Sequence, residues 1–192
     1  HSFCVRLLRR DGANLAQVRS GFNTKFNIYD DSDQLSVIRG VYKHLGIDDK
    51  FLQYRAALSI ISNAKNKKEE PADFYKRAQD PKMQRLAVIF ENYEGKLRQA
   101  NALDFDDLLL ESVRLLRVDP LVREQYNRRF EFVMIDEYQD TNRSQYELMR
   151  LLTESRGNVA VVGDEDQSIY GWRGADIKNI LDFQKDFPET KV

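Results

Sequence analysis

Two short apolar runs, each followed by acidic residues, constrain the fold of this chain more than any other feature. The first run is Phe132–Ile135, with Asp136 and Glu137 directly after it, and the second is Asn158–Val162, followed by GDEDQ. The sequence TNRSQYELMRLLTES between them has a helical pattern. Apolar runs without alternation are typical of strands buried on both faces, and the order strand, helix, strand predicts a parallel sheet in an α/β fold.

The helices around this sheet have recognisable ends. Asn142 and Gln145 form a capping pair at the start of the helix between the two strands. A further helix, ADIKNILDFQKDFP, is expected to close at Pro188.

The part of the chain before Phe130 is mostly helical in pattern, with apolar residues recurring at the helical period. Asp31 and Gln34 predict the start of one helix, and Gly46 predicts its end. Asp119 followed by Pro120 predicts another helix start. This organisation predicts a largely helical region ahead of the α/β layer.

A polar stretch, NAKNKKEEPAD, interrupts the helical region and contains Pro71. We expect a loop or linker here, because proline breaks helices and the stretch has no apolar period. Its basic side chains are balanced by Glu69 and Glu70 and are expected to be solvated; they are Lys65, Lys67 and Lys68.

Composition excludes several classes of protein. The 192 residues are 42% hydrophobic and 32% charged, with a net charge of −1, so contact with nucleic acid requires a local patch. A single cysteine, Cys4, allows no internal disulfide and favours a reducing, cytoplasmic setting. The sequence has neither an apolar run long enough for a membrane span nor a visible signal peptide. Because His1 lies within a helical pattern, we interpret the chain as a fragment; a processed N-terminus is the alternative.

The acidic strand ends predict a phosphate-handling site, because ligands of open α/β sheets sit beyond the carboxyl ends of the strands. Asp136 is short and fixed by its strand, which suits a Mg²⁺ ligand. Glu137 reaches one carbon further, which suits a base that activates water for attack on a phosphate. In the alternative interpretation, Asp136 caps the next helix and Glu137 is solvated.

The loop after the second strand, GDEDQSIYGWRGAD, carries a second set of candidate residues. Gly163 and Gly171 permit sharp turns, and Gln167 can contact a terminal phosphate. Aromatic faces beside a guanidinium are typical of single-stranded nucleic-acid binding, and the loop offers Tyr170, Trp172 and Arg173. A buried tryptophan with a surface arginine is the alternative.

Two of these stretches, VMIDEYQDTNRSQY and VAVVGDEDQSIYGWRGADI, resemble motifs II and III of the UvrD/Rep/PcrA-type superfamily 1 DNA helicases. HSFCVRLLRR is similar to the segment after motif Ia of that family, and ALDFDDLL is similar to its DFDDLL element. Within motif II, Tyr138 stands where many members have phenylalanine. The resemblance implies an incomplete P-loop NTPase (RecA-like) parallel sheet with an inserted all-helical subdomain. The implied division is 1–20, 21–101 and 102–192, with the insertion in the middle.

The resemblance also implies roles for individual residues. Asp136 would bind Mg²⁺ and Glu137 would be the general base of ATP hydrolysis, with Gln167 sensing the γ-phosphate. Nucleotide contacts would come from Asp136, Gln139, Gln167 and Arg173, with Asp140 joining Gln139 in tying motif II to its neighbours. Single-stranded DNA would contact His1, Ser2, Phe3, Tyr170, Trp172 and Arg173, and the helical insertion would contact duplex DNA.

The P-loop that cradles phosphates in this family is missing from the sequence. The one Gly-Lys pair, Gly95-Lys96, lies inside a helical pattern, and no QNYRS motif occurs before Val192. We therefore expect this chain alone to be inactive, and to self-associate through an open sheet edge. Two alternatives remain, a fragment of an AddA/RecB-type helicase–nuclease and a DNA- or protein-binding adaptor without ATPase activity.

Overall fold

The computed structural model describes residues 1–163, 183 and 185–191. The chain forms two compact units, an N-terminal unit of His1–Ser112 and a C-terminal unit of Val113–Val192. The division falls within helix α6 (Phe105–Val118). The three-part division drawn from the sequence stays a prediction.

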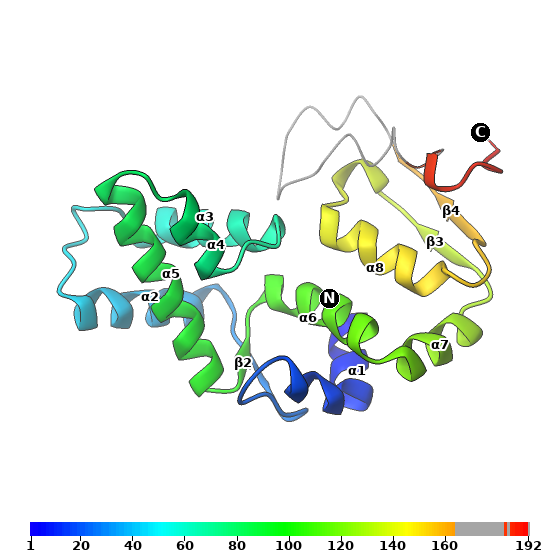
Figure 1. Ribbon diagram of the computed structural model, residues 1–192, viewed down its shortest axis with the longest axis horizontal. Coiled ribbons are helices and arrows are strands. Elements are labelled where there is room, and N and C mark those ends of the chain that lie inside the picture. Colours follow the sequence, from blue (N-terminus) through cyan, green and yellow to red (C-terminus); the bar gives the residue numbers. More distant parts are fainter. Residues whose placement is uncertain (164–182, 184, 192) are drawn as a thin grey trace. The chain divides into compact units, whose positions relative to one another are not determined.

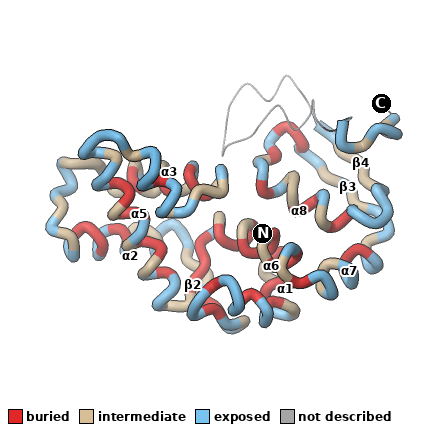
Figure 2. Tube along the Cα trace, viewed as in Figure 1, coloured by how far each residue is buried: buried red, intermediate tan, exposed pale blue. Residues whose placement is uncertain are grey.

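The N-terminal unit is mostly helical (Figure 1). Three of its helices, α2, α3 and α5, surround a common core that includes Tyr42, Ile61 and Phe90. Figure 2 shows buried residues running along these helices. The elements before α6 are α1 (Ser2–Asp11), η1 (Gly12–Gln17), β1 (Asn27–Ile28), α2 (Asp31–Leu45), α3 (Tyr54–Asn66), α4 (Pro71–Arg77), α5 (Pro81–Gln99) and β2 (Ala102–Leu103).

Helices α2 to α5 form an arm with two short connections to the rest of the N-terminal unit. The chain enters this helical arm after β1 and leaves it before β2. The two strands pair in parallel, with Asn27 opposite Ala102 and Ile28 opposite Leu103. Both connections of the arm therefore lie side by side in one small sheet.

The C-terminal unit contains the predicted strand–helix–strand unit. After α7 (Pro120–Arg129), strand β3 (Val133–Ile135) leads through η2 (Tyr138–Asp140) into α8 (Arg143–Thr153) and β4 (Val159–Val161). The strands β3 and β4 are parallel, with Met134 opposite Ala160. The prediction of an α/β fold with a parallel layer is confirmed at this level, whereas the RecA-like P-loop architecture stays a prediction. The helix predicted at 175–188 falls largely outside the described residues.

The strands are not buried on both faces as the apolar runs suggested. Ile135, Val159 and Val161 pack against a small core around Met149, but Met134 is 64% exposed. Successive side chains of a strand point to opposite faces, so Phe132 and Met134 share the second face, which the described residues leave uncovered. A continuous apolar run shows that both faces are apolar, which does not require that both be covered within this chain.

Local signals located most helix ends correctly. Gly46 ends α2 in the left-handed conformation, with φ of 62°. Asp119 caps α7 by accepting a hydrogen bond from Val122 N at 3.1 Å. Asn142 and Gln145 form the predicted reciprocal cap at the start of α8.

Two local predictions were wrong in detail. The cap of α2 is Asp30, whose carboxylate accepts from the backbone N–H of Asp33 while its own backbone N–H donates to the carboxylate of Asp33. The predicted pair, Asp31 and Gln34, is therefore one residue late. Several acids in a row offer more than one capping register, and pattern alone does not choose between them. Pro71 begins helix α4 instead of marking a loop, because the first helical position needs no N–H donor.

Candidate functional site

The ends of β3 and β4 lie side by side, and backbone hydrogen bonds flank the acidic pair between them. Val162 N donates to Ile135 O at 2.8 Å, and Tyr138 N donates to Val162 O at 2.9 Å. Asp136 and Glu137 occupy the stretch between these two bonds. The acidic pair therefore lies beside the tip of the neighbouring strand, where a ligand of an open α/β sheet would bind.

The two carboxylates at this strand end are exposed. Asp136 accepts a hydrogen bond from Glu137 N at 2.9 Å, and the cap of α8 is Asn142, so the alternative in which Asp136 caps that helix is wrong. The ion pairs of the C-terminal unit, in its described part, join other side chains. Two exposed carboxylates that pair with no cation among the described residues are suited to binding a metal cation.

Glu137 has a strained backbone. Its φ of 51° and ψ of 44° are in the left-handed region, which costs a side chain other than glycine about 1–2 kcal/mol. Gln139 Nε2 donates to Glu137 Oε2 at 2.6 Å and helps to hold the carboxylate in place. Strain of this kind persists where the surrounding contacts enforce it, and it concentrates at functional sites.

Gln139, which was predicted to contact nucleotide, is buried and lies against the backbone of Gly163. A Cβ atom at Gly163 would be 2.9 Å from Gln139 Oε1 and 3.1 Å from Gln139 N. The φ angle of Gly163 is not positive, so the feature that requires glycine here is this close approach. The contact links the end of β4 to the residue that orients Glu137.

Replacing Gly163 with alanine is expected to disturb this link. The new Cβ atom would lie 3.1 Å from the backbone nitrogen of Gln139, which cannot move away without distorting the chain. We therefore expect the free energy of unfolding to fall by about 1–3 kcal/mol, the usual cost of overpacking. Faster amide hydrogen exchange in η2 of the Gly163→Ala protein would measure the effect. Gly157→Ala is a poor control because its φ is 61°, whereas Gly40→Ala meets no atom within 4 Å and should leave η2 unchanged. Unchanged exchange in the Gly163 variant would contradict the assigned contact.

Packed aromatic rings support the loop that carries Asp136 and Glu137. Tyr138 is 2% exposed, and its ring lies 5.7 Å from that of Phe183 in an edge-on arrangement. Phe183 in turn stacks on Phe187 at 4.8 Å. Tyr138 therefore anchors the loop between Glu137 and Gln139.

The remaining predicted site residues fall into two groups. Those of the second motif lie outside the described residues, so the roles of Gln167, Tyr170, Trp172 and Arg173 stay predictions. At the start of the chain, α1 begins at Ser2, and His1 and Ser2 are exposed while Phe3 is half-buried. The ring of His1 lies 5.6 Å from that of Phe105. DNA contact by these three residues is likewise untested.

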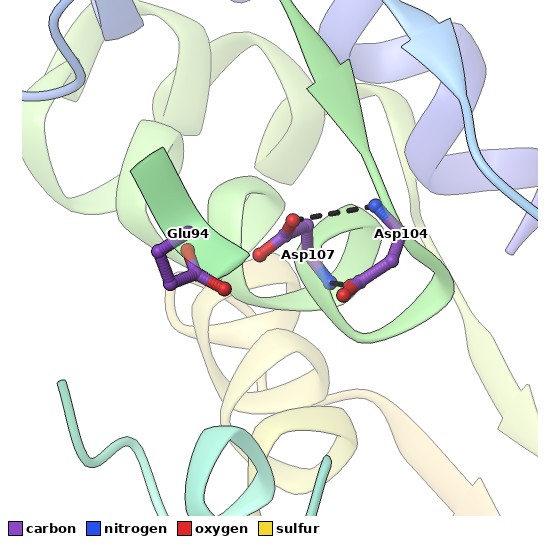
Figure 3. A group of neighbouring side chains, drawn as sticks. All are labelled: Glu94, Asp104 and Asp107. Atoms are coloured by element: carbon purple, nitrogen blue, oxygen red, sulfur yellow. Dashed lines mark hydrogen bonds between the residues drawn. The ribbon is translucent and has the colours of Figure 1, made fainter. Parts of the chain in front are cut away.

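A second cluster of charged residues, unrelated to the acidic strand end, is buried in the N-terminal unit (Figure 3). Glu94, Asp104 and Asp107 each place a carboxylate oxygen within 4.8 Å of the others, which is close enough to hold a metal ion. The ammonium of Lys65 already lies among them, at 2.7 Å from Asp104 and 2.8 Å from both Glu94 and Asp107. We call these four residues the carboxylate corner. A cationic side chain thus occupies the place that a metal would take.

Lys65 contradicts the prediction of a solvated lysine, because only 3% of the residue is exposed. The sequence did carry a signal: Lys65 continues the buried face of α3 formed by Ala57, Ile61 and Ala64. The charged residues that follow Lys65 favour a loop, and they obscure the helical spacing that places this lysine on the buried face.

Burial and pairing act against each other in the carboxylate corner. Burial alone would lower the pKa of Lys65, but the surrounding carboxylates raise it well above its ordinary value. Burial would raise the pKa of Asp104, yet Lys65 holds it below the usual range. Burial and the charge of Asp104 together raise the pKa of Asp107 well above normal. The structure therefore favours a charged Lys65 facing a charged Asp104.

Comparison with known proteins agrees with the resemblance seen in the sequence. Residues 1–188 match the family model described as UvrD/REP helicase N-terminal domain. The chain is 48% identical over 192 residues to the ATP-dependent DNA helicase PcrA of Staphylococcus aureus, which covers 100% of this chain and 26% of that protein. The corresponding protein of Staphylococcus epidermidis is 46% identical over the same shares. The chain thus spans about a quarter of the length of the curated relatives it matches.

Within the described ranges, no helix is both long and apolar enough to cross a membrane. The family match covers nearly the whole chain, and it includes both the acidic strand end and the helical arm. On this evidence, the chain belongs to the family of UvrD/REP helicase N-terminal domains.

Proposed function

We propose that the full-length protein is an ATP-dependent DNA helicase in which the acidic pair after β3 serves ATP hydrolysis. The observation that carries this proposal is the exposed pair Asp136 and Glu137, beside the tip of β4 and with a strained Glu137, in a chain of the UvrD/REP family. The PcrA relatives are named ATP-dependent DNA helicases, which supports the same activity here.

The residues of the site fit distinct tasks in this reaction. Asp136 is short and exposed at the strand end, which suits a ligand of Mg²⁺, and the metal when bound would neutralise charge on the nucleotide phosphates. Glu137 would accept the proton of the attacking water, held in position by Gln139. Gln167 would contact the γ-phosphate, and Arg173 would complete the nucleotide contacts.

The DNA would bind outside this nucleotide site. Tyr170 and Trp172 would stack on bases of a single strand, with further contacts from the His1–Phe3 segment. The helical arm would contact duplex DNA. We propose that a RecA-like motor moves the protein along single-stranded DNA from 3′ to 5′. The full-length protein would act in DNA repair or replication in the cytoplasm.

The proposal is tested by measuring ATP hydrolysis of the full-length protein with and without single-stranded DNA. Hydrolysis that DNA stimulates, together with separation of a labelled duplex, is the expected result. The 192-residue chain alone should show neither, because its sequence contains no P-loop. Absence of both activities in the full-length protein would favour a DNA- or protein-binding adaptor.

The isolated chain is also expected to self-associate through the edges of the β3–β4 sheet. This two-stranded sheet carries exposed apolar side chains, among them Met134 and Val162. Unpaired strand edges beside apolar surface favour pairing with another chain. Sedimentation velocity should therefore show a species that grows with concentration. A monomer at every concentration would refute this prediction.

A further inference from the structure

The carboxylate corner lies where the helical arm joins the rest of the N-terminal unit. Lys65 comes from α3 and Glu94 from α5, both within the arm. Asp104 and Asp107 belong to the start of α6, directly after the returning strand β2. We call the part of the N-terminal unit outside the helical arm its base. The carboxylate corner therefore joins the arm to this base through buried charged groups, next to the paired strands β1 and β2.

The two aspartates are tied to each other before they meet the arm. Asp107 N donates to Asp104 Oδ1 at 2.9 Å, and Asp104 N donates to Asp107 Oδ2 at 3.3 Å, which forms a reciprocal cap at the start of α6. The other oxygen of each aspartate faces the arm. Asp104 Oδ2 accepts from Lys65 and from the hydroxyl of Tyr93 at 3.0 Å, and Asp107 Oδ1 lies 2.8 Å from Lys65. The cap thus fixes the direction in which both carboxylates meet Lys65.

A second buried cation, Arg19, contacts residues of this junction that lie outside the arm. Arg19, which precedes the arm, pairs with Glu111 of α6 at 2.8 Å and donates to the carbonyl of Ala102 in β2 at 3.3 Å. The same guanidinium lies 3.8 Å from Asp107. Asp107 therefore stands between a cation of the base and a cation of the arm.

Carboxyl groups outnumber cations at this junction. Among the described residues, four buried carboxyl groups, those of the corner and Glu111, face two cations, Lys65 and Arg19, and the raised pKa of Asp107 favours its neutral form. Buried ion pairs contribute little net stability compared with apolar packing, but they can select one arrangement over others. Lys65 contacts all three acids of the corner and so links them through a single cation.

We propose that Lys65 is a positioning residue that fixes the helical arm on its base, and with it the surface that the arm presents to duplex DNA. The inference rests on the proposed helicase function for the meaning of that surface. It assigns to the DFDDLL stretch a mechanical role at the root of the arm. The nucleotide site after β3 is not involved.

The test compares Lys65→Met with Lys76→Met in the full-length protein. Methionine keeps much of the length of lysine without its charge, and Lys76 is a matched control because it forms an exposed pair with Asp73 at 3.0 Å. We expect Lys65→Met to keep DNA-stimulated ATP hydrolysis within about twofold, since that site is untouched, and to lower duplex unwinding about tenfold or more, as small misplacements can. Lys76→Met should leave ATP hydrolysis unchanged. Because it removes an exposed charge from the same arm without touching the corner, it measures how much unwinding a lost surface charge alone accounts for, and we expect a smaller fall than in Lys65→Met.

Hydrogen exchange and additional variants test the role of Lys65 by means other than the unwinding activity of Lys65→Met. Hydrogen exchange in β1, β2 and the first turn of α6 should become faster in Lys65→Met and stay unchanged in Lys76→Met. Glu94→Gln removes only one of the three partners of Lys65, and should shift the same readouts in the same direction by a smaller factor, even if Lys65→Met fails to fold. Restoration of unwinding by Lys65→Arg, which keeps the charge, would support positioning by the ion pairs.

Unwinding per ATP hydrolysed that stays unchanged in both Lys65→Met and Glu94→Gln would overturn the inference. A proportional fall of hydrolysis and unwinding would also overturn it, because general unfolding explains that result. If the unaltered protein neither hydrolyses ATP nor unwinds DNA, the proposed function fails. In that case, the exchange measurement still decides whether Lys65 holds the arm.

Discussion

Replacing Glu137 with glutamine in the full-length protein is expected to lower ATP hydrolysis by about 10²–10⁴-fold, the range that a general base contributes. Glutamine matches the shape of glutamate but cannot accept the proton of the attacking water. Its amide oxygen can still accept the hydrogen bond from Gln139, so the loop keeps its geometry. Binding of nucleotide should therefore persist. Steady-state hydrolysis and equilibrium binding of a fluorescent ATP analogue measure the two quantities separately.

Glu131→Gln is the matched control for this experiment. Glu131 lies just before β3, at the opposite end of the strand from the acidic pair, and its side chain is 81% exposed. The same chemical change there should leave both hydrolysis and binding unaltered. Hydrolysis that survives in Glu137→Gln would remove Glu137 from the role of base. Loss of binding together with hydrolysis would instead indicate that Glu137 helps to hold the nucleotide.

The strain at Glu137 connects this expected result to the fold. A backbone in the left-handed region would be relieved by glycine, so a purely structural position would favour that residue. Here a glutamate is held in that conformation between two hydrogen bonds to the end of β4. The surrounding contacts maintain this strained conformation. It places the carboxylate at the strand tip, where the proposed chemistry needs it.

Features that depend on a few neighbouring residues could be predicted from the sequence. The cap formed by Asn142 and Gln145 involves atoms only three residues apart, and Gly46 ends a helix through its own backbone. The parallel order of β3 and β4 followed from the helix between them. The position of the acidic pair at the strand end followed in turn from that order.

Features that depend on distant partners could not be predicted in the same way. Lys65 and Asp104 are 39 residues apart, and only the packing of α3 against the start of α6 makes Lys65 a buried ion-pair partner. The close approach of Gly163 to Gln139 likewise requires the exact register of two strands. The exposure of Met134 depends on what covers the second face of the sheet, and that information is not in the strand itself.

Asp104→Ala is expected to destabilise the root of the helical arm by about 3–5 kcal/mol, the usual cost of breaking a buried ion pair. The change removes the cap of α6, leaves the buried hydroxyl of Tyr93 without its partner, and takes one carboxylate from Lys65. Asp104→Asn separates these effects, because asparagine caps helices about as well as aspartate, a contribution of about 0.5–2 kcal/mol. We therefore expect the asparagine variant to lose clearly less stability. Native-state hydrogen exchange of the first turn of α6 measures both losses locally.

The loss in Asp104→Ala should also depend on pH, with a definite sign. Lys65 holds the pKa of Asp104 below its ordinary value, so the charged carboxylate stabilises the folded state. That contribution is fully present above the unfolded pKa of about 3.9 and is lost as the pH falls through the lower folded value. The difference between the unaltered protein and Asp104→Ala should therefore shrink on acidification below about pH 4. A difference that grows on acidification would mean that Asp104 is protonated in the folded protein. In that case Asp104 would form no ion pair with Lys65, and the ion pair would not stabilise the root of the arm.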